Sequence, residues 1–569
     1  MTNFTFSIEN PSQQYIHISA QFNTSEEVTF VQLPSWRPGR YQLADFAKNV
    51  RNFVVLDENN QKIEFQKSNK DCWAVQTKDI KSITVNYNFY ANTINAGSSY
   101  LDATQLYVNP VNCCVYVQEA FNEPVSIQLN VPEHWEVASS MEKTKDGYQV
   151  ANIEELLDTP FIASEQLQHR EFTSHGVLFH VWFNGEVKPK WERLLEDFQK
   201  FTDAQINKFN EFPVKEYHFI NLILPYKTYH GVEHQKSTVI SLGPSYEVFG
   251  ELYKELLGVS SHELYHTWNV KAIRPIEMFP YNFAKENYSK LGYLCEGVTT
   301  YQGDLFLFKS GVFNEKQYFE ELTAQLQKHF DNFGRFNYSV AESSFDTWLD
   351  GYEIGAPNRK VSIYTEGCLL AFVTDVEIRR ANEDKFGLDE VMKYLYFNFA
   401  LKGKGVSEKD YQDAIENIAG TSFQWLFDDY IHGCRPFESI ITNALDHLGI
   451  ELDHLPSKSY AAARMGLKVL PAGKDFIVHA MYPGGPAETS GLMQGDKITA
   501  VNGFSCDGEL DKWLNYFDDD AKTVTVNRSS TMLNITFPEV NRNFYTDYSI
   551  KKIEKLTKKQ EVAYERWRK

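Results

Sequence analysis

The stretch that decides the fold is SSHELYHTWNVKAIRP, residues 260–275. It places His262 and His266 on either side of Glu263, in the pattern His-Glu-x-x-His. On an α-helix, residues four apart lie on one face, so the two imidazoles can reach the same cation. The stretch therefore predicts a helix that carries part of a metal site. Two histidines that only pack or face solvent are the alternative.

Glu263 gives the pattern its chemistry. Imidazole suits Zn²⁺, and a catalytic zinc site has three protein ligands and one open position. A carboxylate beside the first ligand can face that open position, take a proton from water and pass it to a leaving amine. The pattern is a metallopeptidase signature for this reason.

A third ligand is expected downstream of the histidines. Glu296 lies in YLCEGVTTYQGDL, an apparently helical segment, and a hairpin of two helices could bring its carboxylate to the histidine face. Glu277, Glu286 and Asp304 are competing acids in less apolar surroundings. Glu296 is the predicted ligand, and an acid that only interacts with the start of a helix is the alternative.

Length, charge and cysteine usage limit the class of protein. The 569 residues exceed what one hydrophobic core supports, so two to four domains are expected. The 56 basic and 76 acidic residues leave a formal charge of −20, which argues against a nucleic-acid partner. We see no signal-peptide pattern and no apolar run long enough for a membrane span. The seven scattered cysteines suit a reducing compartment, so a cytoplasmic location is expected.

The sequence pattern changes several times along the chain. Residues 1–170 alternate apolar and polar positions, as in SITVNYNFY, which predicts a β-sandwich. Within residues 171–456, helical spacing in KPKWERLLEDFQKFTDAQINKF and the strand-like runs YHFINLIL and KSTVISL predict a mainly helical α+β unit. Residues 457–540 return to short strands with Pro/Gly turns. Residues 541–569 are predicted to form a charged helical tail with a solvated face.

Several segments look like those of a known family. HELYHTWNVKAIRP followed by EGVTTYQGDL resembles the glycyl aminopeptidase family of gluzincin zinc metallopeptidases. PSWRPGRYQLADFAKNV, SSFDTWLDGYE and FQWLFDDYIHGCRPF resemble other family segments, and PGGPAETSGLMQGDKITAVNG resembles the PDZ domain of many members. The resemblance implies a multidomain α+β fold with an N-terminal β-sandwich, a thermolysin-like, mainly helical catalytic domain and a C-terminal PDZ domain. It also implies one Zn²⁺ per chain, held by His262, His266 and Glu296.

The resemblance assigns substrate binding to Gly231, Glu233 and His234. Related aminopeptidases have a Gly-x-x-Glu segment on an edge strand, and its glutamate, here Glu233, binds the free α-amino group of the substrate. A fixed carboxylate suits an ammonium. His234 is expected to be a cleft residue and not a ligand. His230 replaces a glycine usual in the family, which adds bulk and a titratable group near the amine site.

Tyr364 is the second catalytic residue that the resemblance implies. It falls in VSIYTEGCLLAF, where related enzymes place a tyrosine that stabilises the oxyanion, and a phenol donor suits that role. Glu366 stands where the family commonly has lysine, which reverses a charge near the site. Trp268, Asn269 and Arg274 are candidates for orienting the ligands, although Trp268 fits core packing better.

The expected function is a zinc-dependent aminopeptidase that acts through a zinc-activated water, and the family name implies small first residues such as Gly or Ala. Peptides with a free N-terminus are the expected substrates. An endopeptidase or a dipeptide-releasing enzyme is the alternative within the class. From another class, the alternative is a non-catalytic PDZ scaffold. In either case a peptide C-terminus could bind the PDZ domain near Met465-Gly466-Leu467-Lys468.

Overall fold

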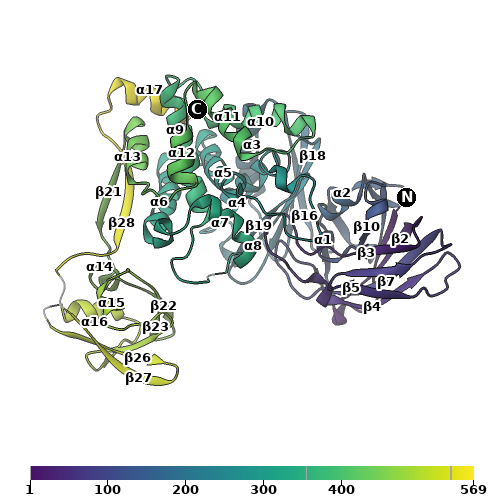
Figure 1. Cartoon of the computed structure of the whole chain (residues 1–569), viewed down its shortest axis with the longest axis horizontal. Helices are drawn as coiled ribbons and strands as arrows, with labels where there is room; N and C mark the ends of the chain where they lie inside the picture. Colours follow the sequence, from purple (N-terminus) through teal and green to yellow (C-terminus); the bar gives the residue numbers. More distant parts are fainter. Residues whose placement is uncertain (1, 354, 519, 539–540) are drawn as a thin grey trace.

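The computed structural model describes residues 2–353, 355–518, 520–538 and 541–569, which form three regions in chain order (Figure 1). A β-rich N-terminal region lies beside a central, mainly helical region. A smaller C-terminal lobe is connected to the central region through strands β21 and β28 (Figure 1). Within the part of the chain that is described, no helix has the length and apolar character that a membrane crossing requires.

Alternating side chains explain the N-terminal region. Along β1, β2 and β7 buried apolar residues alternate with partly exposed ones, so one face of the sheet covers a core. The strands form sheets in the orders β13-β14-β11-β1-β2-β7-β4, β10-β3-β6-β5 and β12-β15-β9-β8. The predicted β-rich N-terminal region is confirmed. Its elements are β1 (Thr2–Ile8), β2 (Tyr15–Asn23), β3 (Val28–Gln32), β4 (Val50–Leu56), β5 (Phe65–Asn69), β6 (Cys72–Gln76), β7 (Ser82–Tyr90), β8 (Tyr100–Leu101), β9 (Gln105–Val108), α1 (Pro110–Cys113), β10 (Tyr116–Val117), β11 (Val125–Asn130), β12 (Glu136–Ser139), β13 (Glu142–Thr144), β14 (Gly147–Val150), α2 (Ile153–Leu157) and β15 (Phe161–Ser164).

A five-stranded sheet begins the central region, in the order β16-β17-β18-β20-β19. β17, β18 and β20 are parallel neighbours, and β19 is an antiparallel edge strand beside β20. The two strand-like runs predicted from sequence are β18 and β20. One face packs against α3 (Trp191–Phe209), where the Phe198 ring lies 4.9 Å from that of Phe219. The strands are β16 (Gln168–Ser174), β17 (Val177–Asn184), β18 (Glu216–Ile223), β19 (Thr228–Glu233) and β20 (Ser237–Gly243).

Helices form the rest of the central region, as the sequence predicted. The HELYH helix, α4, packs against α5. At this contact the Ser261 hydroxyl donates a hydrogen bond to the Gly303 carbonyl at 2.7 Å. The start of α5 lies beside the second motif histidine, since Thr299 Oγ1 is 3.4 Å from His266 Nδ1. The helices are α4 (Tyr253–Tyr265), the π-helix η6 (Tyr293–Gly297), α5 (Val298–Lys309), α6 (Glu315–Asp331), α7 (Val340–Phe345), α8 (Thr347–Asp350), α9 (Ile363–Ala381), α10 (Leu388–Asn398), α11 (Glu408–Ala419), α12 (Gln424–Leu426) and α13 (Glu438–His447).

The C-terminal lobe has its own sheet and core. Its strands follow the order β22-β23-β24-β26-β27, with β25 beside β24. Leu467, Val478, Ile498 and Val526 are among the buried residues of this core. The elements are α14 (Tyr460–Met465), β22 (Leu467–Ala472), β23 (Asp475–Met481), α15 (Pro486–Thr489), β24 (Lys497–Val501), β25 (Phe504–Ser505), α16 (Leu510–Tyr516), β26 (Lys522–Arg528) and β27 (Thr531–Phe537).

The end of the chain is not the solvated helical tail expected for residues 541–569. β28 (Thr546–Lys552) pairs with β21 (Ile450–Pro456), and only α17 (Lys558–Trp567) is helical. Ala563, Tyr564 and Trp567 form a buried apolar stripe on this charged helix. The Trp567 indole is completely buried and donates to the Tyr301 hydroxyl at 2.9 Å. The prediction of a solvated helix was wrong because only three apolar residues of this highly charged segment form the buried face.

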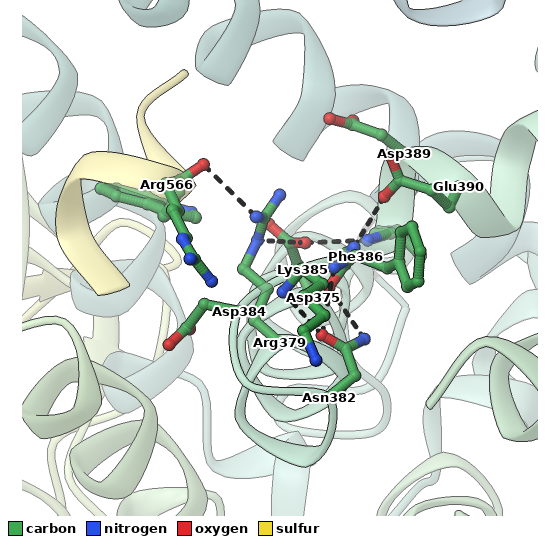
Figure 2. Close-up of polar contacts among 12 residues, drawn as sticks. Asp375, Arg379, Asn382, Asp384, Lys385, Phe386, Asp389, Glu390 and Arg566 are labelled. Atoms are coloured by element: carbon green, nitrogen blue, oxygen red, sulfur yellow. Dashed lines mark hydrogen bonds and ion pairs between the residues drawn. The ribbon is translucent and has the colours of Figure 1, made fainter. Parts of the chain in front are cut away.

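A polar network fixes α17 to the end of α9 (Figure 2). Arg379 pairs with Asp375 one turn away, Nε to Oδ1 at 3.0 Å, and its Nη1 donates to the carbonyl of Arg566 at 3.4 Å. Asp375 also accepts from the backbone N–H of Leu388 at 2.8 Å. The last helix therefore belongs to the central region.

A buried ion pair joins the N-terminal and central regions. Asp158 accepts from Lys271 Nζ at 2.7 Å and lies 3.1 Å from His234 Nδ1. Nearby, Arg274 donates to Glu154 at 2.8 Å. Burial alone would raise the pKa of Asp158, but Lys271 and His234 hold it well below its usual value.

We expect Asp158→Asn to lower the thermal unfolding midpoint at pH 7, because the buried Lys271 ammonium would lose its counter-ion. Removing one partner of a buried pair costs about 3–5 kcal/mol. Since the pKa of Asp158 is lower in the folded than in the unfolded chain, this stabilisation is complete above about pH 4 and is lost as the pH falls further. Thermal unfolding of both proteins from pH 7 to pH 3 should show the gap shrinking at the acidic end. A gap that stays constant contradicts the ion-pair assignment.

Candidate active site

The two motif histidines lie at the end of α4. The helix ends at Tyr265, and His266 keeps helical backbone angles as its C-cap, so both rings point to one side. The Nε2 atoms of His262 and His266 are 3.0 Å apart. Glu296 Oε2 lies 3.4 Å from His266 Nε2 and 3.9 Å from His262 Nε2. The structure thus brings the three predicted ligands together.

The donor set fits a zinc ion. His266 Nδ1 lies 3.0 Å from the Asn269 carbonyl oxygen, an acceptor, so Nδ1 carries the ring proton and Nε2 can present a lone pair. Two imidazole nitrogens and one carboxylate oxygen are a usual ligand set for catalytic zinc with an open fourth position. Burial lowers the pKa of His266, but Glu296, Glu233 and Glu263 together raise it to about 10. The pocket therefore favours positive charge where the ligand atoms meet.

Glu263 lies on the wall of a cavity of about 750 Å³ that also contains the three ligand residues. Its Oε2 is buried and has no hydrogen-bond partner among the residues described. Burial and the carboxylates of Glu233 and Glu296 hold the pKa of Glu263 well above its usual value, which suits a general base. Strand β19 passes close by: a Cβ on Gly231 would lie 2.1 Å from Glu263 Oε1. Glycine at this position leaves room for the carboxylate.

The N-terminal region closes the cavity at Glu233, the last residue of β19. Glu233 is 5% exposed, and within the described part of the chain its Oε1 has no hydrogen-bond partner. Gly39 lies against the other oxygen, because a Cβ there would be 2.4 Å from Oε2. One ligand atom each from Glu233, Glu263 and His266 lies within 4.8 Å of the others. A buried carboxylate without a partner is costly, so this position is prepared for a cationic group.

His230 adds bulk but no charge to the lining of the cavity. Its Nε2 lies 3.3 Å from Nη2 of the buried Arg37. Because a guanidinium only donates, Nε2 must be the acceptor. Burial and the Arg37 charge lower the pKa of His230 to about 3, so the ring is neutral at neutral pH.

Tyr364 lies in the first turn of α9 and lines the cavity. Burial raises the pKa of its phenol well above the usual value, so the hydroxyl remains a donor at neutral pH. Glu366, which reverses the charge usual at this position, pairs with a buried histidine. Its two carboxylate oxygens lie 2.9 and 2.7 Å from Nδ1 of His329. Glu366 is therefore anchored on α6 and does not displace Tyr364.

Comparisons with known proteins match two ranges of the chain. Residues 3–165 match the Peptidase M61 N-terminal domain, and residues 255–370 match the M61 glycyl aminopeptidase domain. The chain thus carries the N-terminal and catalytic domains of the M61 glycyl aminopeptidase family. The central region therefore carries a peptidase domain, and its two imidazoles and one carboxylate fit a zinc ion. No curated protein matches it in sequence.

A solved structure shares the fold. An aminopeptidase N family protein from Idiomarina loihiensis has a TM-score of 0.90 and 23% identity, over 100% of this chain and 99% of that one. An M1 zinc metallopeptidase from Deinococcus radiodurans is more distant, with a TM-score of 0.49 and 12% identity over 76% of this chain and 94% of that one. The first of these similarities extends the shared fold over all three regions of this M61 chain.

Residues outside the zinc motif hold Glu296 in place. The Tyr41 hydroxyl, from the N-terminal region, donates to Glu296 Oε1 at 3.2 Å. Asn269 Nδ2 donates to the carbonyls of Leu294 at 2.9 Å and Cys295 at 3.1 Å, which fixes the π-helix that carries Glu296. Sequence reasoning assigned no role to Tyr41. The available signal was the family-like segment PSWRPGRY, which supplies both Gly39 and Tyr41.

We expect Tyr41→Phe to weaken Zn²⁺ binding by about tenfold, because the ligand carboxylate loses a hydrogen bond that orients it while the ring keeps its packing. Competition with a chelator measures the affinity. Tyr87→Phe is the matched control, since Tyr87 is a buried N-terminal tyrosine that donates to the Cys113 carbonyl at 2.6 Å. Equal zinc affinity in wild type and Tyr41→Phe would contradict the positioning role.

Two sequence-based roles need correction. The observed geometry gives no support to substrate binding by His234: its ring faces Asp158 and does not line the cavity, because successive residues of an extended chain point to opposite sides. Arg274 orients no ligand, since its guanidinium pairs with Glu154. Trp268 is completely buried and stacks on Phe209 at 4.5 Å, as core packing requires.

The segment expected to bind a peptide C-terminus attaches the C-terminal lobe instead. Lys468 pairs with Asp331 at the end of α6. The Gly466 carbonyl accepts from the Tyr482 N–H at 2.8 Å, and a Cβ on Gly466 would lie 3.4 Å from the Phe544 ring. The segment is engaged within the chain, so these contacts give no support to a peptide C-terminus bound there.

Proposed function

We propose that this M61 chain is an aminopeptidase that releases single N-terminal residues from peptides. The observation that carries the proposal is the buried, unpartnered Oε1 of Glu233 at the end of the cavity that Gly39 closes. The α-ammonium of a peptide would give that carboxylate the charge-assisted hydrogen bond it lacks. The first peptide carbonyl would then lie beside Glu263 and His266, whose ligand atoms are within 4.8 Å of that of Glu233.

The chain's own residues supply the proton transfers and the charge stabilisation. His262, His266 and Glu296 would hold Zn²⁺, which when bound polarises the carbonyl and acidifies water. Glu263 would accept the proton of the attacking water and deliver it to the leaving amine. The Tyr364 hydroxyl would donate to the oxyanion as it forms. The high pKa of each of these two groups supports its role.

We propose that small first residues such as Gly or Ala are preferred. One N-terminal segment places Gly39 against Glu233 and Tyr41 against Glu296. This segment would therefore occupy space next to the first residue of a bound peptide. His230 and Arg37 add further bulk at the same end. A large first side chain would have to displace this segment.

The test is a panel of matched peptides with free and N-acetylated ends and with Gly, Ala or Leu first. Free peptides alone should release single residues, fastest from Gly and Ala. Glu233→Gln should lower kcat/KM for free peptides by at least about 30-fold, because the buried charge pair is lost. The exposed Glu186→Gln is the control and should match wild type. Equal cleavage of acetylated peptides would indicate an endopeptidase, and released dipeptides a dipeptide-releasing enzyme.

The C-terminal lobe is proposed to be a PDZ domain spanning residues 457–540, after a catalytic domain over 171–456 and a β-sandwich over 1–170. Its sheet with α15 and α16 packed on one core supports the proposal. Since Lys468 ties the lobe to α6, its proposed role is structural.

A further inference from the structure

A second group of metal-binding side chains lies on the face of the central sheet opposite its helices. Strands β16, β17 and β18 place His169, Glu171, His180, Glu216 and His218 there. The register sets Glu171 opposite His180, and His180 opposite His218. The neighbouring residues Phe172, Phe179, Val181 and Tyr217 point the other way and lie in the hydrophobic core. This group is separate from the cavity of the active site.

Three ligand atoms in this group converge. His169 Nε2 and His180 Nδ1 are 2.9 Å apart, and Glu171 Oε2 lies 3.7 Å from His180 Nδ1. All three lie within 4.8 Å of one another. In a tetrahedral zinc site, bonds of about 2.0–2.2 Å separate ligand atoms by roughly 3.4 Å, so small side-chain rotations suffice.

Proton positions decide which atoms are free to bind. The Trp182 indole N–H, which can only donate, points to His218 Nδ1 at 3.1 Å. The His218 proton must then be on Nε2, where it faces Glu216 Oε1 at 3.1 Å. His218 therefore has no free lone pair for a metal, because Nδ1 accepts from Trp182 and Nε2 carries the proton. His180 Nε2 lies 3.0 Å from the same oxygen of Glu216 without the alignment of a hydrogen bond. A small rotation of the ring would let an Nε2 proton face this carboxylate and would leave Nδ1 as a lone pair.

We propose that His169, Glu171 and His180 form a second site for a divalent transition-metal ion such as Zn²⁺, which ties β16 to β17. Two imidazoles and one carboxylate suit such an ion, and the 57% exposure of the Glu171 side chain leaves water access to the remaining position. Glu216 completes the arrangement that metal-bound histidines usually have, a carboxylate on the opposite ring nitrogen. His169 only has to move its proton from Nε2 to Nδ1.

The charge state of the rings is compatible with this proposal. Burial, with a smaller effect of the neighbouring imidazole, lowers the pKa of both His169 and His180. Both rings are therefore neutral at neutral pH and keep a lone pair for a cation.

The test uses the full chain with the catalytic ligands removed, His262→Ala/His266→Ala, so that peptidase activity plays no part. After metal removal this protein should still bind one Zn²⁺ per chain by calorimetry and metal analysis, and Zn²⁺ should raise its thermal unfolding midpoint. Co²⁺ should give the visible absorption of a low-symmetry nitrogen and oxygen site. Adding His180→Ala, or Glu171→Gln at an exposed position, should abolish or strongly weaken binding. Adding Glu216→Gln should weaken it by about tenfold.

His134→Ala is the matched control, because His134 and Glu165 form another exposed histidine–glutamate pair, at 3.3 Å. It should leave Zn²⁺ binding unchanged. The proposal is overturned if the protein without catalytic ligands binds no Zn²⁺, or if His180→Ala and His134→Ala bind it equally. A failed aminopeptidase assay leaves all of these readouts intact, so the two proposals fail independently.

Discussion

Glu263→Gln is expected to lower kcat for peptide hydrolysis by about 10³-fold with no change in zinc content. The amide keeps the size of the side chain and its place against Gly231, but it cannot accept a proton. His262, His266 and Glu296 keep their positions because Glu263 holds none of them. Steady-state kinetics on a free Ala-first or Gly-first peptide, with metal analysis of the same sample, measures both quantities.

The control for Glu263→Gln is Glu251→Gln, at an exposed position just before α4. It should have wild-type kinetics, since it removes a carboxylate from the same part of the chain without touching the cavity. Activity of the Glu263 variant above about a tenth of wild type would rule out its role as the base. Loss of zinc together with activity would show a structural effect instead.

Gly231→Ala is expected to lower kcat/KM by about 100-fold or more, although it adds only one methyl group. The new Cβ would lie 2.1 Å from Glu263 Oε1 and 2.8 Å from Val259 Cγ2, so either β19 or the Glu263 carboxylate must move. A displacement of about 1 Å in a catalytic group can cost this much. The same kinetic assay measures the loss, and circular dichroism checks that the fold is kept.

Two variants separate this clash from a general effect of alanine. Gly250→Ala should be neutral, because the nearest atom to its Cβ is 3.5 Å away, the Glu247 carbonyl oxygen. In a Glu263→Ala background, Gly231→Ala should cost much less further activity, since the clash with the carboxylate is gone and only the 2.8 Å contact with Val259 Cγ2 remains. A loss of the same size in both backgrounds would place the effect elsewhere on β19.

Much of the site could be predicted from the sequence, because it follows local spacing. The four-residue spacing of His262 and His266 needs only a helix to put both rings on one side. The period-two pattern of the N-terminal region and the helical pattern of α3 likewise depend on neighbours in the chain. These features are set by backbone geometry, so one sequence suffices to predict them.

Contacts between distant segments had no such signal. Tyr41 meets Glu296 across 255 positions of sequence, and no periodicity encodes that hydrogen bond. His329 satisfies Glu366, and Arg37 keeps His230 neutral, so two apparent departures from the family pattern are compensated by partners on other elements. Sequence reasoning expected a titratable group at His230 and a reversed charge at Glu366, but not the partner of either.

The sequence by itself therefore determined the zinc motif, the order of the regions and the class of chemistry. Only the tertiary structure decided that Gly39 closes the cavity at Glu233, that His234 faces away, and that Trp567 is core. The physical reason is that local patterns fix which face a side chain occupies. Its partner, burial and protonation state depend on what the rest of the chain packs against that face.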